Sequence, residues 1–285
     1  MTPVLPYTAP PTVPPTAQQT VVRFDDVNLT FGDVPALVHL SFSMRAGETR
    51  VVLGAAGSGK TMLLKTAVGL VAPDSGHISL FGEEVTGRKE SQLYDVRSKV
   101  GILFQEGGLF DSLTIAENVA YPLLNQHAGQ TPPPEEVDRR VRESLSFVEL
   151  EHTLDKFPSE LSGGMRRRVG IARAVVTAPQ LVLYDSPTAG LDPITANTII
   201  NLILKGRDMR NTATIMVTHR YQDGHLMANF RYNPSSGKIE RAESSQLTTR
   251  FFVMQEGRLY FEGSEAELRA SQDPYVEKFA RPGSS

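Results

Sequence analysis

Residues 49–61 of the chain read TRVVLGAAGSGKT. An apolar run ends at Gly54, and the residues from Gly54 to Thr61 match the pattern G-x-x-x-x-G-K-[ST] in full. Such a loop wraps phosphates with backbone N–H groups, and the helix after it presents its positive end to the same anion. An apolar-periodic stretch follows the loop directly, so we expect a strand, a phosphate-binding turn and a helix in this order.

The residue types of this loop suit a nucleoside triphosphate. Lys60 would reach the β- and γ-phosphates, and the Thr61 hydroxyl would coordinate Mg²⁺. The alternative, an incidental glycine-rich turn, is disfavoured because a strand precedes the motif and a helix follows it. The loop and the residue after it are therefore the expected nucleotide-binding residues: Gly54, Ala55, Ala56, Gly57, Ser58, Gly59, Lys60, Thr61 and Met62.

A second predicted strand ends in an acid. Residues 181–192 read LVLYDSPTAGLD, and four apolar residues precede Asp185. A nucleotide-bound Mg²⁺ needs a second protein contact, and in phosphate-loop enzymes an acid at the end of a buried strand supplies it. A surface aspartate that merely ends a strand is the weaker alternative, because the run before it is apolar. We therefore expect Asp185 to hold the metal, directly or through water.

Strand and helix patterns alternate along the rest of the chain. Apolar runs typical of buried parallel strands occur at 180–185 and 212–219. One helical face within 132–150 is formed by Val137, Val141, Leu145 and Val148. Further strands are expected within 21–31, 41–54, 96–105 and 251–263, the last as a hairpin around Glu256-Gly257, with a helix from Glu265. This alternation predicts an α/β fold with a mostly parallel core sheet.

The composition is that of an ordinary globular protein. The 285 residues are 40% hydrophobic and 21% charged, the net charge is −3, and there are no cysteines. These values exclude disulfide and thiolate chemistry and give no reason to expect bulk attraction to nucleic acid. No run approaches the roughly 20 apolar residues that cross a bilayer. The proline- and threonine-rich residues 1–20 lack a secretory signal pattern and are expected to be a disordered tail.

Residues 161–174, LSGGMRRRVGIARA, indicate which family of phosphate-loop proteins the chain resembles. Together with the phosphate loop and the segments GILFQ and AGLD in the expected order, they make residues 21–263 resemble the nucleotide-binding subunit of an ATP-binding cassette (ABC) transporter. The resemblance implies a phosphate-loop ABC ATPase fold with an N-terminal antiparallel β subdomain. It also implies a helical subdomain at about 106–175 that carries the signature LSGG. A C-terminal helical extension is expected at 264–285.

The same resemblance assigns roles to single residues. Phe31 would stack on adenine, and Ser162, Gly163 and Gly164, at a predicted helix start, would complete the ATP site of the opposite subunit. One phosphate loop and one signature per chain imply a homodimer that binds ATP and Mg²⁺. The implied metal ligands are Thr61, Gln105 and Asp185. The implied catalytic residues are Asp185, Gln105, the switch histidine His219 and the residue at position 186, Ser186.

The sequence around the motifs resembles that of one subfamily. Residues 91–123 and the stretches PSELSGGMRRR and GLDPITA look like the ATPases of Mla/Mce-type lipid transporters. This implies an ATPase homodimer beneath two transmembrane permease subunits, on the cytoplasmic face of the membrane, with an Mce-type lipid-binding protein in the same complex. The alternatives are a non-transport ABC protein acting on ribosomes or DNA, and an ATP-binding module that scarcely hydrolyses. A phosphate-loop kinase is disfavoured by LSGGM.

Ser186 departs from the family pattern, which has glutamate at this position to polarise the attacking water. A serine hydroxyl cannot accept a proton usefully near neutral pH, so hydrolysis should be slowed without loss of nucleotide binding. His219 and Gln105 remain, and phosphoryl transfer depends mostly on positioning and electrostatics. Naturally slow turnover, replacement by another acid such as Glu106, and an altered sequence all stay open.

Three further segments carry expectations. The segment 221–249 is longer than the family's usual link and contains a turn signal at 233–237, which predicts a small extra hairpin. The apolar stretch 107–123, with Phe110, is expected either to meet a permease or to fill the protein's own helical lobe. The arginines at 166–168 are expected on a solvated or phosphate-facing side of their helix rather than in a nucleic-acid patch.

Overall fold

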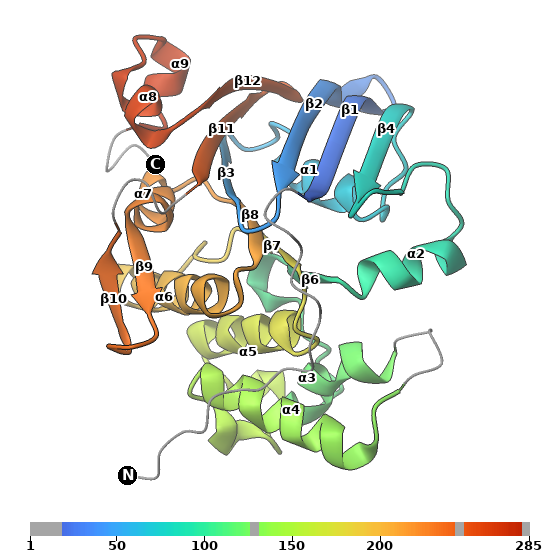
Figure 1. Ribbon diagram of the computed structural model, residues 1–285, viewed down its shortest axis with the longest axis vertical. Coiled ribbons are helices and arrows are strands. Elements are labelled where there is room, and N and C mark those ends of the chain that lie inside the picture. Colours follow the sequence, from blue (N-terminus) through green and yellow to red (C-terminus); the bar gives the residue numbers. More distant parts are fainter. Residues whose placement is uncertain (1–18, 126–130, 243–247, 281–285) are drawn as a thin grey trace.

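The core of the protein is a six-stranded sheet in the order β12-β11-β3-β8-β7-β6. The computed structural model describes residues 19–125, 131–242 and 248–280 (Figure 1). Neighbouring strands from β11 to β6 are parallel, and β12 pairs antiparallel with β11. The strands are β3 (Thr49–Gly54), β6 (Val100–Leu103), β7 (Leu181–Asp185), β8 (Ala213–Val217), β11 (Thr249–Gln255) and β12 (Arg258–Gly263). The predicted α/β fold with a mostly parallel core is confirmed.

A second, antiparallel sheet has the order β2-β1-β4-β5. It lies to one side of the core sheet in Figure 1. Its strands are β1 (Thr20–Phe31), β2 (Val34–Arg45), β4 (Ser75–Leu80) and β5 (Glu83–Glu84). Phe42 stacks on Phe24 within this sheet and meets Phe252 of β11 edge-on, with ring centroids 4.8 Å and 5.2 Å apart. Aromatic packing therefore joins the two sheets.

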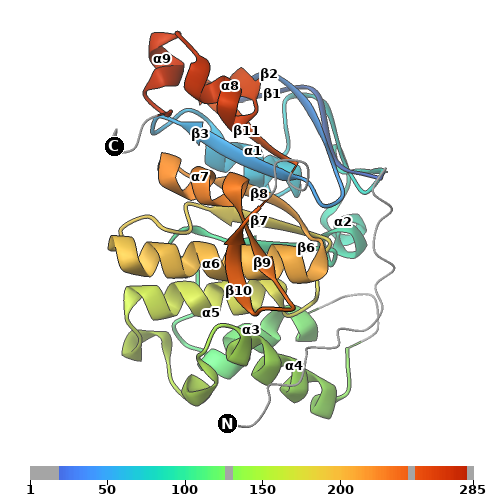
Figure 2. The ribbon, with the colours of Figure 1, turned by 60° about the vertical axis from the view of Figure 1, so that its left-hand side comes forward.

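Helices lie in layers beside the core sheet (Figure 2). They are α1 (Lys60–Ala67), α2 (Glu90–Arg97), α3 (Ile115–Leu124), α4 (Pro134–Phe147), α5 (Gly163–Val175), α6 (Pro193–Arg210), α7 (Tyr221–Asn229), α8 (Glu265–Ala270) and α9 (Pro274–Glu277), with 3₁₀ turns η1 (Gln105–Gly107), η2 (Glu151–Thr153) and η3 (Pro158–Glu160). The sheet separates two hydrophobic cores. Val51 and Leu53 of β3 face the core that contains α3 to α7, whereas Val52 faces the core shared with α1 and the antiparallel sheet. Strand β3 is buried on both faces, which explains its unbroken apolar run.

The helical layer of α3, α4 and α5 shows the predicted amphipathic face. Val137, Val141, Leu145 and Val148 are buried, as their spacing predicts. Asn118 of α3 is fully buried and holds the segment before the helix, since it accepts from the Phe110 N–H at 2.8 Å and donates to the Phe110 and Leu113 carbonyls at 3.0 Å each. This single amide fixes the stretch that follows Gln105.

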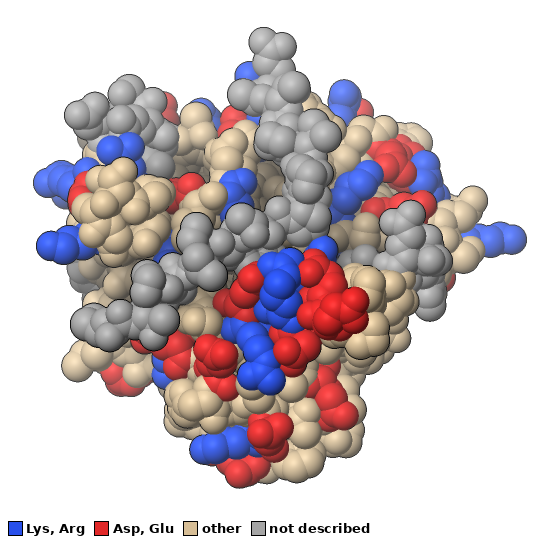
Figure 3. Space-filling model, turned by 60° about the horizontal axis from the view of Figure 1, so that its bottom comes forward, with Lys and Arg blue, Asp and Glu red and all other residues tan. Residues whose placement is uncertain are grey.

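Charged side chains on the face formed by this layer are of mixed sign (Figure 3). On α4, Glu136 pairs with Arg139 and Arg140, at 2.8 Å and 2.6 Å, and Asp138 pairs with Arg142 at 2.8 Å. Hydrogen bonds from the two arginines lower the pKa of Glu136 to about 2. Pairs at helical spacing satisfy one another's charge, so this helix does not form a single-sign surface.

The segment after β8 forms the predicted extra hairpin, from β9 (Phe230–Asn233) and β10 (Lys238–Arg241). Arg207 of α6 donates to the Phe230 carbonyl at 3.0 Å, and the Tyr232 N–H donates to Asp208 at 2.6 Å. The Lys205 ammonium lies 4.8 Å from the Phe147 ring centroid and 5.8 Å from that of Tyr232. The hairpin is therefore tied to α6 and, through Lys205, to the end of α4.

Several predictions fall partly outside the described residues. The proline-rich tail (1–20) is described only from residue 19, and the insertion and the C-terminal extension lack 243–247 and 281–285. The domain boundaries stay predictions. In the described part of the chain, no helix is both long and apolar enough to cross a membrane.

Candidate nucleotide site

The phosphate loop has the predicted strand before it and the predicted helix after it. Its backbone conformation demands glycine at two positions in particular. Gly59, which precedes α1, has φ +98, and an added Cβ would lie 2.3 Å from the Ala36 carbonyl oxygen. At Gly54, φ is +149 and a Cβ would lie 2.5 Å from the Met254 carbonyl oxygen. Both positions therefore exclude any side chain, which keeps the loop narrow.

Lys60 holds its ammonium group inside this loop. Its Nζ donates to the carbonyls of Gly54 and Ala55 at 2.8 Å and 2.6 Å, and to the Ser58 hydroxyl at 3.2 Å. Burial lowers the pKa of Lys60, and the nearby Asp185 carboxylate raises it. A cation that is partly removed from water interacts more strongly with an anion than an exposed one does.

Thr61 and Asp185 bring two oxygen donors together at the end of the sheet. The Thr61 Oγ1 donates to Asp185 Oδ2 at 2.9 Å, and Asp185 is 4% exposed. A hydroxyl and a carboxylate are the hard oxygen ligands that Mg²⁺ prefers, so these side chains fit that ion. The apolar run before Asp185 is wholly buried, which removes the reading of this residue as a surface aspartate.

Ser186 follows Asp185 in a left-handed conformation, with φ +50. Its N–H donates to the Val217 carbonyl at 2.9 Å, and its hydroxyl donates to Asp185 Oδ1 at 3.1 Å. The serine therefore adds a hydrogen-bond donor to the Asp185 carboxylate. It brings no group that can accept a proton at this position.

Gln105 and His219 lie at the same edge of the core sheet, whereas Phe31 belongs to the antiparallel sheet. Gln105 opens η1 just after β6, and His219 lies just beyond the end of β8. Because β3, β8, β7 and β6 are parallel, their carboxyl ends meet at one edge, where ligands of open α/β sheets bind. Gln105 and His219 are exposed. Phe31, at the end of β1, is 52% exposed.

The signature lies at the start of α5, as predicted. Ser162 caps the helix by accepting from the Met165 N–H at 3.3 Å. A Cβ on Gly163 would meet nothing within 4 Å, whereas one on Gly164 would lie 2.6 Å from Thr195 Cγ2 of α6. One side of the signature therefore packs on α6, and the other is open.

An open hollow of about 450 Å³ adjoins the signature. Its described lining residues are Ser162, Gly163, Gly164, Met165, Arg168, Gly190, Leu191, Asp192, Ile194, Thr195, Thr198 and Ile199. They come from the signature, from the segment Ala189–Asp192 and from α6, and none belongs to the phosphate loop. Ile194 is 81% exposed.

The expectation for the arginines at 166–168 is wrong for Arg167. Arg167 is buried and its Nη2 donates to the Ala189 carbonyl at 3.0 Å. Arg166 and Arg168 donate to the Leu161 and Val148 carbonyls, at 2.6 Å and 3.3 Å. Guanidinium groups have no acceptor, so they serve here to satisfy backbone carbonyls around the signature helix.

A buried carboxylate that the sequence patterns did not single out lies behind the site. Asp223 of α7 accepts hydrogen bonds at Oδ2 from the hydroxyls of Thr188 and Thr218. Burial raises the pKa of Asp223, while the two hydroxyls and Arg220 lower it. Thr188 follows Ser186 by two residues and Thr218 precedes His219. Their closeness to the motifs was the available signal, but only the fold brings them to one carboxylate.

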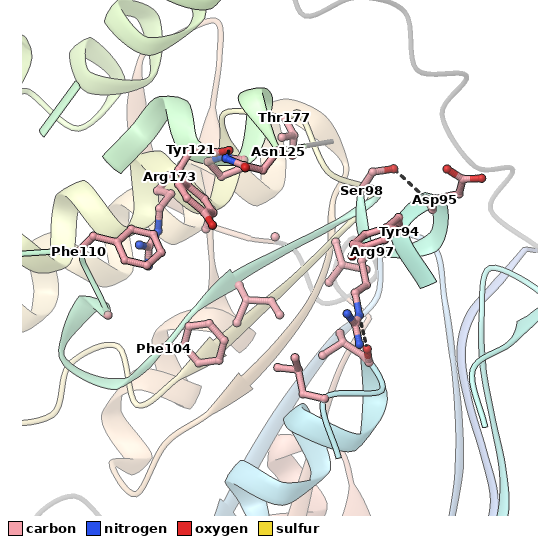
Figure 4. A pocket seen from close by; sticks show the side chains of 18 residues that line it. Tyr94, Asp95, Arg97, Ser98, Phe104, Phe110, Tyr121, Asn125, Arg173 and Thr177 are labelled. Atoms are coloured by element: carbon pink, nitrogen blue, oxygen red, sulfur yellow. Dashed lines mark hydrogen bonds between the residues drawn. The ribbon is translucent and has the colours of Figure 1, made fainter. Parts of the chain in front are cut away.

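A second hollow, of about 520 Å³, runs beside the start of the glutamine turn η1 (Figure 4). In Figure 4, Phe110, Tyr121 and Arg173 lie on one side and Tyr94 and Arg97 on the other. Leu70, Phe104, Phe110 and Tyr121 line it and are 37–48% exposed. The Phe110 and Tyr121 ring centroids are 4.7 Å apart, and the Arg173 guanidinium lies 5.7 Å from the Phe110 ring. Ile115, by contrast, is buried in the helical layer.

The fold and the site define a phosphate-loop ATPase of the cassette type. A family model described as ABC transporter matches residues 37–189, more than half of the chain, and the chain belongs to this family. It is an ABC-type ATPase.

Similar proteins cover nearly the whole chain. The intermembrane phospholipid transport system ATP-binding protein MlaF of Escherichia coli (strain K12) is 32% identical over 259 residues, which span 91% of this chain and 88% of MlaF. MlaF of Haemophilus influenzae is 32% identical over 257 residues, which span 89% and 88%. A dimeric structure of the ATP-binding cassette MJ0796 in a post-hydrolysis state, bound to ADP and Pi, has a TM-score of 0.71 at 27% identity and covers 85% of this chain and 98% of that one.

Proposed function

We propose that this protein is the ATP-binding and ATP-hydrolysing subunit of a phospholipid transporter of the Mla/Mce kind. The observation that carries the proposal is the division of one anion site between two faces of the chain. Thr61 at the end of the phosphate loop is hydrogen-bonded to the buried Asp185, and the signature presents Gly163 to open space. The similarity to MlaF over 91% of the chain supports the phospholipid class of cargo.

The binding half acts through this chain's own groups. The loop N–H groups and the Lys60 ammonium bind the phosphates, and Phe31 stacks on adenine. Thr61 and Asp185, with Gln105, would hold Mg²⁺, which when bound neutralises charge on the β- and γ-phosphate oxygens. His219 and Gln105 orient the γ-phosphate and the attacking water from the ends of β8 and β6.

Two copies of the chain complete the site. The helix α5 presents the Ser162 hydroxyl and the N–H groups of Gly163 and Gly164 at its positive end. In a symmetric pair, this end would bind the γ-phosphate held by the partner's phosphate loop, so ATP becomes part of the interface. The open side of Gly163 and the hollow beside the signature support this face as the one that meets the partner.

The groove beside η1 suits a permease. Its apolar rings and the neighbouring Arg97 and Arg173 would receive a short helix from a transmembrane subunit at the cytoplasmic side of the membrane. Phe110 lies in the segment between Gln105 and α3, so a movement of this partner would reach the glutamine directly. An Mce-type lipid-binding protein would complete the complex.

Ser186 favours a second candidate, an ATP-driven dimer that hydrolyses only slowly. General-base help is worth about 10²–10⁴-fold in rate, and the Ser186 hydroxyl donates to Asp185 instead of accepting a proton. In this candidate ATP binding closes the pair, and opening follows slow turnover. Glu106 stays the first acid to test as a replacement; its side chain lies outside what the structure describes.

Co-purification with its untagged genomic neighbours, followed by lipid mass spectrometry, tests the function. We expect a permease in the purified complex, with phospholipid that changes in amount when ATP is added. A complex with ribosomes or DNA and no permease would contradict the transport function. A permease with a cargo other than phospholipid would contradict only the lipid assignment.

A further inference from the structure

We propose that Asp223 is a positioning residue that couples the segment Ala189–Asp192 to His219, so that docking of the partner subunit sets the position of the histidine. The proposal rests on the catalytic role given to His219 under the proposed function. The proposal also rests on two hydrogen bonds to one buried carboxylate oxygen. Asp223 Oδ2 accepts one from the hydroxyl of Thr188, which follows β7, and one from the hydroxyl of Thr218, which follows β8.

Asp223 is held in a fully enclosed position in the first turn of α7. The residue is 1% exposed. The Thr218 hydroxyl donates to its Oδ2 at 2.8 Å, and the Thr188 hydroxyl donates to the same oxygen. The Arg220 Nε lies 3.7 Å from Oδ1. Burial of a carboxylate is costly unless its oxygens are bonded, so each of these donors is needed to keep the residue in place.

On the β8 side, the network clamps the backbone around His219. The Thr218 N–H donates to the Val52 carbonyl of β3 at 3.0 Å. Its Oγ1 both donates to Asp223 and accepts from the Arg220 N–H, at 3.1 Å. The residues before and after His219 are therefore tied to one hydroxyl. A shift of that hydroxyl would move the histidine, whose own side chain is exposed.

On the β7 side, Thr188 lies between Ser186 and the surface beside the signature. The Ala189 N–H donates to the Ser186 carbonyl at 3.1 Å, and the Leu191 N–H donates to the Thr188 carbonyl at 3.2 Å. Gly190 and Leu191 line the open hollow next to the signature. If a partner subunit displaced this segment, Thr188 would move first, and its hydrogen bond would pass the displacement to Asp223 and then to Thr218.

This connection has a distinctive kinetic consequence. Its hydrogen bonds reach no residue of the phosphate loop, and it meets the nucleotide site only beside His219. Removing either hydrogen bond to Asp223 should lower the rate of hydrolysis and leave the affinity of one chain for ATP unchanged. Because the two hydroxyls act in series, removing both should lower the rate of hydrolysis no more than removing one. Two independent packing defects would instead add.

The test uses the full chain with Thr188→Val, Thr218→Val and the double variant. Valine has nearly the shape of threonine and lacks the hydroxyl. Single-turnover ATP hydrolysis with protein in excess measures the rate, titration calorimetry measures ATP affinity, and thermal melting checks folding. Thr153→Val is the matched control, since Thr153 is also buried and its hydroxyl donates to the Leu150 carbonyl at 2.7 Å. His219→Ala gives the reference for loss of the histidine.

We expect each single variant to hydrolyse ATP about tenfold more slowly, as for the loss of one hydrogen bond to a charged group. The double variant should equal the singles, and Thr153→Val should match the parent. Asp223→Asn loses the charge that both hydroxyls and Arg220 contact, so it should slow hydrolysis by a similar factor and leave ATP affinity unchanged.

Rates like the parent's in both threonine variants, or losses that multiply in the double variant, would overturn the coupling. If His219→Ala also leaves the rate unchanged, the catalytic role of the histidine fails as well. A slow His219→Ala variant beside unaffected threonine variants would overturn the coupling alone.

Discussion

The phosphate loop and the signature both place backbone N–H groups at a helix N-terminus, which suits an anion, but they differ in how many contacts their residues already make within the chain. At the phosphate loop, Lys60, Thr61 and Asp185 are already bonded within the chain. At the signature, Gly163 faces open space beside a hollow of about 450 Å³. We therefore expect the phosphate loop to bind nucleotide in the single chain. We expect the signature to act only when a second chain covers it.

The largest effect is expected from a substitution in the phosphate loop. Lys60→Ala removes an ammonium group that would bond two phosphates, and hydrogen bonds to charged groups are worth about 1.5–3 kcal/mol each. ATP affinity should therefore fall by roughly 10²-fold or more in titration calorimetry. Lys278→Ala, at an exposed lysine of the C-terminal segment, should bind like the parent. Equal affinity in Lys60→Ala and the parent would contradict the assignment of the loop.

A substitution in the signature should affect dimerisation and not ATP binding by the single chain. Ser162→Arg places charge and bulk where the partner's γ-phosphate would sit, so ATP-dependent dimerisation should be lost while ATP binding to the single chain survives. Light scattering on a sizing column, with ATP and Mg²⁺, measures the first property and calorimetry the second. Equal amounts of dimer in parent and variant would count against the signature as the interface.

Ser186 follows Asp185 directly, and its replacement by glutamate should raise the rate of hydrolysis. Ser186→Glu should increase kcat by roughly 10²-fold, equivalent to about 2.7 kcal/mol of barrier. KM for ATP should change little, because the base acts on the transition state. Ser186→Gln is the matched control, since it has the size of glutamate but cannot accept the proton. A parent at an ordinary rate with no gain from glutamate would point to another acid, with Glu106 first.

The smallest effect is expected at the groove, away from the nucleotide. Phe110 is 41% exposed in the groove, and Phe110→Asp should weaken association with the co-expressed permease by about tenfold, since it removes an apolar contact and adds a charge. ATP binding should be unchanged. Leu124→Asp is the control, because Leu124 is 50% exposed in the same layer but is not a lining residue of the groove. Equal loss in both variants would place the docking surface elsewhere.

The same contrast explains what could be predicted from the sequence. The phosphate loop, the strand ending at Asp185 and the helix starting after Ser162 follow from local patterns, because each needs particular residues at fixed spacing. The extra hairpin followed from its turn residues. The burial of Arg167 and the junction at Asp223 could not be predicted in this way. They depend on which carbonyls and hydroxyls the packing of α5, α6 and α7 brings together.

A mixing experiment tests the central claim, that each ATP site combines one chain's phosphate loop with its partner's signature. Chains with Lys60→Ala and chains with Ser162→Arg each form no complete site alone. A mixed pair has one complete site, formed by the loop of the second chain and the signature of the first. Single-turnover ATP hydrolysis should therefore be absent in each variant and recovered when the two are combined. If folded variants stay inactive together, or if Ser162→Arg hydrolyses ATP alone, the two halves do not form a shared site.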